Sequence, residues 1–133
     1  MKQIIKDMIE SKDLRIGNNL LWGSTIVQIS SIHEDNTIRF WDANKINTVG
    51  CFKINAFNPI HLTDEILLKC GFEMNRLSFS IKFQLNNFII FKIDDYFYAK
   101  PIGVKISLNS LHQLQNLYFA LTGEELLLLF LLY

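Results

Sequence analysis

The side chains that could perform acid–base or metal chemistry are scattered along this 133-residue chain. His33, His61 and His112 lie in three different segments, and none has a second histidine, cysteine or carboxylate at a metal-ligand spacing such as HExxH. Cys51 and Cys70 have no CxxC spacing, so we expect two free thiols rather than a disulfide or a zinc site. The sequence therefore predicts no metal site and no cofactor.

Four pairs of acidic residues could suggest general acid–base catalysis, but neighbouring carboxylates usually mark a solvated turn or the start of a helix. Catalytic pairs normally come from separate segments that face each other across a cleft. The chain also has no glycine-rich phosphate loop and no GxSxG motif. We therefore expect no catalytic residue and a protein that is not an enzyme. The pairs are Glu34/Asp35, Asp64/Glu65, Asp94/Asp95 and Glu124/Glu125.

A first candidate protein-binding patch lies on a predicted C-terminal helix, opposite its apolar stripe. His112, Gln115, Asn116 and Phe119 fall within about 100° of one another on a helical wheel. An aromatic ring among amides and an imidazole is typical of a small protein-contact patch. The alternative is structural: another segment covers Phe119, and the polar groups satisfy buried backbone.

A second candidate patch consists of Arg39 and Trp41. Residues alternate between the two faces of a strand, so a strand that turns Phe40 inward would turn both of these side chains outward. The structural alternative is that Trp41 closes the end of a barrel.

A nucleic-acid interface is the alternative function, because small bent barrels often bind single strands through exposed aromatic residues. Tyr96 and Tyr98 lie near several lysines of a predicted second sheet. Against this, alternation along the strands scatters the lysines over both faces. In addition, 13 Lys and Arg balance 13 Asp and Glu, and a net charge of zero offers little affinity from counterion release. The lysines are Lys82, Lys92, Lys100 and Lys105.

The N-terminal half has the pattern of strands and turns that is typical of a small barrel. Four short β-rich runs follow one another over residues 13–58, with turn signals at Gly23-Ser24 and at 33–36. Such closely spaced strands predict a small SH3-like β-barrel or half-barrel. Ahead of it, residues 2–11 have apolar residues at helical spacing and predict a short amphipathic helix.

The C-terminal half begins with a short helix over 62–72, which Thr63 can cap and Gly71 can end. Residues 77–108 predict an antiparallel meander of three or four strands, and 77–83 alternate apolar and polar residues as a half-buried strand does.

The strongest predicted helix begins after Ser110, which forms a capping-box pattern with Gln113, and ends at Thr122-Gly123. Its apolar stripe is expected to pack on the sheet. The apolar run 126–133 is either a buried strand or a second helix; left exposed, it would favour a homo-oligomer. The stripe consists of Leu111, Leu114, Leu117, Tyr118 and Leu121.

Three segments together carry a family resemblance: LRIGN at 14–18, IHLTDE through KCGF at 60–72, and HQLQNLYFALTGEEL at 112–126. Their order and spacing resemble a family of small uncharacterised proteins in Bacteroidota genomes, prophages and phages, over about residues 13–126. That family has no assigned activity, so the resemblance implies only a context, that of a phage or mobile-element accessory protein in bacterial cytoplasm. The apolar run at the end departs from the family pattern.

We therefore expect an α+β fold in one compact domain, 1–133, which subdivides into a barrel-like part (13–58) and a part with helix, meander and helix (59–133). The longest apolar run has eight residues, against the roughly 20 that span a bilayer, so we expect a cytoplasmic protein without membrane association. The expected function is non-enzymatic binding of a host or phage protein, in an anti-defence or host-takeover role. A nucleic-acid-binding module is the alternative.

Overall fold

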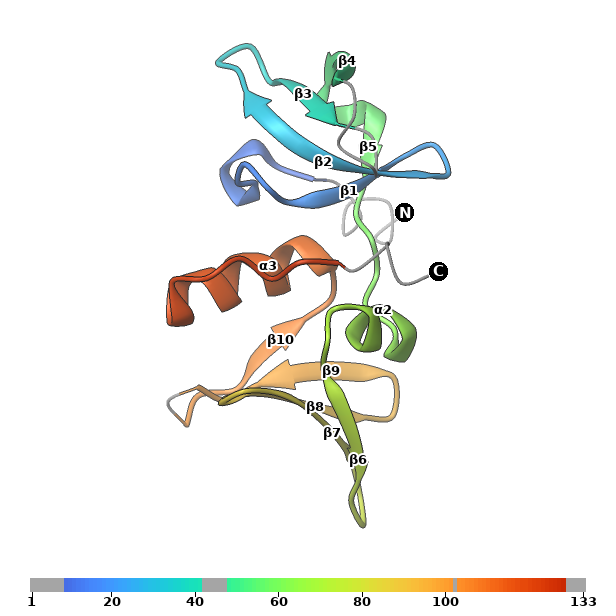
Figure 1. Ribbon diagram of the computed structural model, residues 1–133, viewed down its shortest axis with the longest axis vertical. Helices are drawn as coiled ribbons and strands as arrows, with labels where there is room; N and C mark the ends of the chain where they lie inside the picture. The colour runs from blue at the N-terminus through green and yellow to red at the C-terminus, as the bar shows by residue number, and fades with distance from the viewer. Residues whose placement is uncertain (1–8, 42–47, 102, 129–133) are drawn as a thin grey trace.

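The computed structural model describes residues 9–41, 48–101 and 103–128, and it confirms the α+β class. Two antiparallel sheets form the outer layers, and helix α3 (Leu111–Thr122) lies between them (Figure 1). The layers are joined by a linker that carries the short helix α2 (Asp64–Lys69). The helix therefore has a sheet on each side.

The N-terminal sheet is a curled half-barrel with the strand order β4-β3-β2-β1-β5. The pairing register shifts between Ile29 and Ser31 and again between Phe40 and Trp41, and such bulges bend a strand and increase its twist. Its own small core contains Leu20, Val27 and Phe40. The strands are β1 (Asn19–Trp22), β2 (Thr25–Ile32), β3 (Thr37–Trp41), β4 (Thr48–Lys53) and β5 (Phe57–Asn58).

The C-terminal sheet is a meander with the order β10-β9-β8-β7-β6, and it has five strands rather than three or four. The predicted strand over 77–83 is wrong in its first half, because the chain reverses there: the Leu77 amide donates to the Ser80 carbonyl at 2.8 Å. The strands are β6 (Glu73–Arg76), β7 (Ile81–Leu85), β8 (Phe88–Ile93), β9 (Tyr96–Ala99) and β10 (Ile106–Leu108).

Both predicted helices of the C-terminal half are confirmed by their caps. The Thr63 hydroxyl accepts from the Ile66 amide at 3.1 Å and begins α2. The Gln113 side chain accepts from the Ser110 amide at 3.2 Å at the start of α3. Gly123 ends α3 with φ +75°, a left-handed conformation that glycine adopts at little cost.

The main core lies between α3 and the C-terminal sheet. Leu111, Leu114 and Tyr118 of the predicted stripe are buried there, but Leu121 is 49% exposed, so its expected place in the core is wrong. The chain then runs back along α3 (Figure 1), and Leu126 and Leu128 enter the same core.

Two predicted elements fall largely outside the described residues. Of the C-terminal run, 126–128 form neither a helix nor a strand, and 129–133 are not described. Of the N-terminal helix over 2–11, only 9–11 are described, and Ser11 begins a 3₁₀ turn, Ser11–Asp13. Among the described residues, no helix is long and apolar enough to span a bilayer.

Candidate partner-binding surface

Gln115, predicted to face a partner, is instead enclosed between the layers and only 1% exposed. Its Oε1 accepts from the Asn19 amide at 2.9 Å, and its Nε2 donates to the Asn19 side-chain oxygen at 2.9 Å and to the Leu126 carbonyl at 3.1 Å. The structural alternative therefore holds for Gln115, since its polar groups satisfy buried backbone.

Asn116 and Phe119 join the same layer boundary through Arg15. Asn116 donates to the Asp13 carbonyl at 2.7 Å, and its oxygen accepts from the Asn18 side chain at 2.9 Å. The Arg15 guanidinium forms an ion pair with Glu125 and lies 4.1 Å from the centre of the Phe119 ring. These contacts tie the segment before β1 to α3, and they leave Phe119 partly exposed.

His112 is buried, and its Nδ1 has no hydrogen-bond partner among the described residues. Burial lowers the pKa of the imidazole, and the Asp13 carboxylate opposes this shift. His112 lines a hollow of about 600 Å³ together with Asp13, His61 and Asp95. No group of three or more histidine, cysteine or acidic residues could hold a metal ion within the described part of the chain.

The predicted patch on α3 is therefore not an outer surface, because His112 and Gln115 are buried within the chain. The helical wheel separated an apolar face from a polar face correctly, but it could not show that a second sheet covers the polar face. Of the four residues, Phe119 and Asn116 retain contact with solvent.

Arg39 and Trp41 follow the predicted alternation on β3. Phe40 is fully buried, Arg39 is exposed and Trp41 is half-buried. Arg39 lies opposite Cys51 on β4, and Trp41 pairs with Gln28 and with Thr48. The patch of Arg39 and Trp41 belongs to the N-terminal layer, so it is separate from the residues of α3.

The two cysteines differ in their surroundings. Cys51 is exposed, whereas burial of Cys70 raises the pKa of that thiol to about 12.

Of the residues considered for nucleic-acid binding, Lys92 lies on one face of the C-terminal sheet, and Lys82, Tyr96 and Tyr98 lie on the other. Lys92 turns toward α2, where its Nζ lies 2.9 Å from the Asp64 carboxylate, and it is therefore not available to a phosphate. Lys82 faces the other side, since it pairs with Phe91 rather than with Lys92. Tyr96 and Tyr98 share that side.

We call the side of the C-terminal sheet that faces away from α3 the open face. Alternate residues Phe83, Ile90, Phe97 and Ala99 form the core with α3, so their neighbours along each strand point the other way. No helix formed by the described residues lies over this side in Figure 1. The open face presents Glu73 and Asn75 of β6, Lys82 and Gln84 of β7, Ile89, Phe91 and Ile93 of β8, Tyr96 and Tyr98 of β9 with Lys100 after it, and Ser107 of β10 with Lys105 before it.

A row of aromatic and cationic side chains crosses the middle of the open face. Lys82, Phe91 and Tyr98 lie directly opposite one another on β7, β8 and β9. The Phe91 and Tyr98 rings are stacked with centres 5.7 Å apart, and Lys105 Nζ lies 4.3 Å from the centre of the Tyr98 ring. The strand order places Phe91 and Lys105 on opposite sides of Tyr98, so neighbours cover both sides of this ring.

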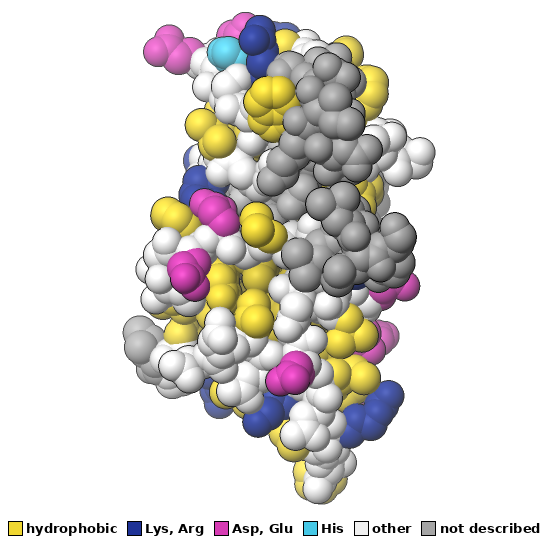
Figure 2. All heavy atoms as spheres, in the orientation of Figure 1, with side chains coloured by type: hydrophobic (Ala, Val, Ile, Leu, Met, Phe, Trp, Pro, Cys, Tyr) yellow, Lys and Arg dark blue, Asp and Glu magenta, His cyan; other side chains and the backbone are white. Residues whose placement is uncertain are grey.

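The end of the open face near the β6–β7 turn is apolar and exposed. Ile93 pairs with Tyr96, which is 73% exposed, and the turn adjoins them because Ile81 pairs with Lys92. Phe79 in this turn is 93% exposed. Hydrophobic side chains accordingly lie at the lower tip of the molecule in Figure 2, with cationic side chains on both sides. We call Leu77, Phe79, Ile93 and Tyr96 the apolar end.

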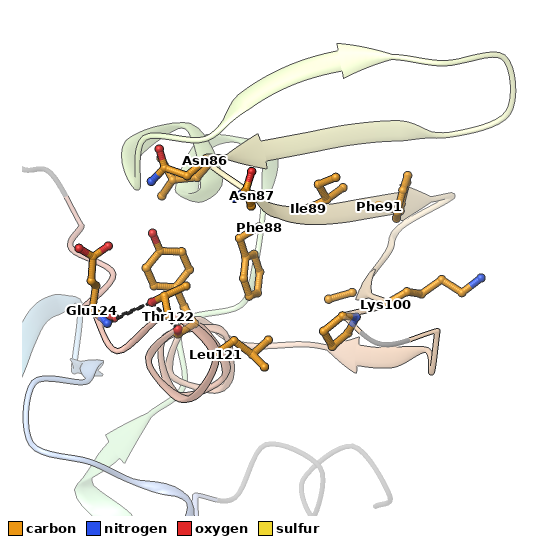
Figure 3. A pocket seen from close by; sticks show the side chains of 13 residues that line it. Asn86, Asn87, Phe88, Ile89, Phe91, Lys100, Leu121, Thr122 and Glu124 are labelled. Carbon is orange, nitrogen blue, oxygen red and sulfur yellow. Dashed lines mark hydrogen bonds between the residues drawn. The ribbon is translucent and has the colours of Figure 1, made fainter.

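A second hollow of about 470 Å³ lies between the C-terminal end of α3 and the β7–β8 turn. Phe88 and Leu121 face each other across it, and Asn86 and Glu124 lie at its edge (Figure 3). The exposure of Leu121 thus reflects its position beside an open hollow instead of the core.

The sequence did not single out Phe79 or Phe91. A signal for Phe91 exists in 88–93, where apolar residues occupy both faces of a strand although the predicted C-terminal helix can cover only one face. For Phe79 the strand-like alternation was misleading, because it continues through the turn.

The chain matches no protein-family model, no curated protein and no solved structure. The resemblance to the Bacteroidota and phage family therefore stays a prediction.

Proposed function

We propose that this protein is a non-enzymatic binding protein, and that it binds a partner protein through the open face of the C-terminal sheet. The observation that carries the proposal is the apolar end, where Phe79 and Tyr96 expose large rings beside Leu77 and Ile93. Contiguous exposed apolar and aromatic side chains are typical of protein-binding sites.

The proposal retains protein binding as the expected function but moves it to another surface. Gln115 and His112 are committed to the interior, and Asn116 is engaged by Asp13 and Asn18. Arg39 and Trp41 remain a smaller second candidate on the N-terminal sheet. The sequence resemblance supports a phage or mobile-element origin, with the bacterial cytoplasm as the place of action and an anti-defence or host-takeover role.

Nucleic-acid binding is the second candidate, and Lys82, Lys105 and exposed Tyr96 favour it. Three observations weigh against it. The Tyr98 ring has neighbours on both sides, which leaves little room for a base to stack. Lys92 is paired with Asp64, and the chain has no net charge.

The test is affinity purification of the tagged full-length protein from a nuclease-treated bacterial host lysate. We expect a stoichiometric protein partner whose recovery is lost with Phe79→Ser and with Tyr96→Ser. Ile16→Ser is the matched control, because it also removes an exposed apolar side chain but lies before the N-terminal sheet.

Equal recovery of the partner with the wild type, with Phe79→Ser and with Tyr96→Ser would refute the proposal. Binding of a labelled single-stranded oligonucleotide at about 50 mM salt, weakened by Lys82→Glu, would instead support the nucleic-acid candidate.

A further inference from the structure

We infer that the open face recognises an acidic polypeptide segment, which places a large apolar side chain on the apolar end and carboxylates on the lysines beside it. This inference rests on the proposed function and specifies the chemistry of the partner. It is carried by the charge of the face and by the order of its residues along the strands.

The open face carries more positive than negative charge. Lys82, Lys100 and Lys105 lie on it, against Glu73, which pairs with Gln84 at the β6 edge, while Asp94 and Asp95 form the turn beyond Ile93 and Tyr96. Lys92 is neutralised by Asp64 on the other side of the sheet. Lys82, Lys100 and Lys105 form no ion pair within the described part of the chain, so their charges are available to a partner.

The apolar and cationic side chains follow one another in a fixed order. Ile93 and Tyr96 form one cross-strand row, and Lys82, Phe91 and Tyr98 form the next row, two residues further along each strand. Two residues of strand span about 7 Å, and Lys100 lies another two residues on. The face thus changes from apolar to cationic over about 14 Å.

A short amphipathic segment fits this order. A helix advances 5.4 Å per turn, so one apolar anchor with acidic residues one to three turns away would reach the apolar end and the lysines together. Carboxylates can form ion pairs with the lysines without a free aromatic ring, whereas nucleobases need the free face of a ring on which to stack. The covered Tyr98 ring therefore favours an acidic peptide over a single-stranded nucleic acid.

The experiment is selection of a random 12-residue peptide display library on the full-length protein, followed by fluorescence polarisation of labelled selected peptides. We expect selected peptides to contain at least two acidic residues and one aromatic or large aliphatic residue. We expect Lys82→Glu/Lys105→Glu to weaken their binding about tenfold or more, and Phe79→Ser to do the same.

Lys12→Glu/Lys53→Glu is the matched charge control, because it also reverses the charge of two exposed lysines but lies outside the C-terminal sheet, and its binding should equal that of the wild type. Circular dichroism of each variant confirms that it is folded. Selected peptides that lack acidic residues, or that bind the charge-reversed variant as tightly as the wild type, would overturn the inference.

Failure of the inference is distinct from failure of the proposed function. A captured protein whose recovery depends on Phe79 and Tyr96 but not on Lys82 or Lys105 would overturn the acidic partner and leave protein binding in place. Recovery independent of all four residues would overturn both.

Discussion

The side chain of Gln115 and residue Asn19 form a reciprocal pair of hydrogen bonds in which each partner both donates and accepts, at 2.9 Å in each direction. Gln115 belongs to α3 and Asn19 to β1, so this pair joins the middle layer to the N-terminal sheet across 96 residues of sequence. Both residues are buried. The pair thus links the two layers through buried hydrogen bonds.

Gln115→Leu is expected to lower the free energy of unfolding by about 2–4 kcal/mol. The replacement leaves the Asn19 amide and the Leu126 carbonyl buried without that partner, and each unsatisfied group costs about 1–3 kcal/mol. Urea unfolding measures the change. Gln84→Ala on the open face is the control, with an expected change below about 0.5 kcal/mol; equal effects of the two variants would contradict the role of Gln115.

Arg15→Ala is expected to cost about 1–2 kcal/mol, because it removes an ion pair with Glu125 and a cation–π contact with Phe119 that are both partly exposed. A double-mutant cycle with Phe119→Ala isolates the second contact, and we expect a coupling of about 0.5–1 kcal/mol. A coupling near zero, with Arg15→Lys as stable as the wild type, would show that the ring contact contributes nothing.

The stability of the protein is expected to fall as the pH drops below about 6.5, the ordinary pKa of histidine. Burial lowers the pKa of His112, so between 6.5 and this lowered value the unfolded chain takes up a proton that the folded chain does not. The loss stops once the pH is below the folded pKa. Urea midpoints from pH 8 to 5 measure it.

The matched variants for this pH dependence are His112→Gln and His33→Gln. We expect His112→Gln to flatten the slope between pH 6.5 and 5, whereas His33→Gln should keep it, because His33 is exposed. The same slope in all three proteins would assign the pH dependence to other groups.

A chain that ends after Glu125 is expected to be destabilised by at least about 3 kcal/mol, because Leu126 and Leu128 are buried in the main core and each buried leucine contributes roughly 1.5–3 kcal/mol. Thermal unfolding measures this loss.

Self-association through the apolar run is better tested with Leu127→Ser, because the Leu127 side chain is half exposed. Light scattering of a dimeric wild type and a monomeric Leu127→Ser would support that contact, and equal masses would exclude a role for Leu127.

The candidate surface was predicted only in part. Tyr96, Tyr98 and Lys82 were identified and do share one face, since alternation along a strand is a local property. Lys92 was assigned to the same group, but it lies on the opposite face because its position along β8 is offset by one residue from Phe91. Phe79 was expected in a half-buried strand, and a chain reversal at 77–80 exposes it instead.

The sequence by itself determined where the two helices of the C-terminal half begin and end. The Thr63 and Gln113 caps and the stop at Gly123 depend on hydrogen bonds and backbone angles within a few residues, which the local residue types dictate. Only the tertiary structure decided which faces meet water. Placing α3 between two sheets buries both its apolar and its polar side, so Gln115 becomes part of the interior while the far side of the C-terminal sheet remains uncovered. Burial depends on contacts between distant segments, and a local pattern does not contain them.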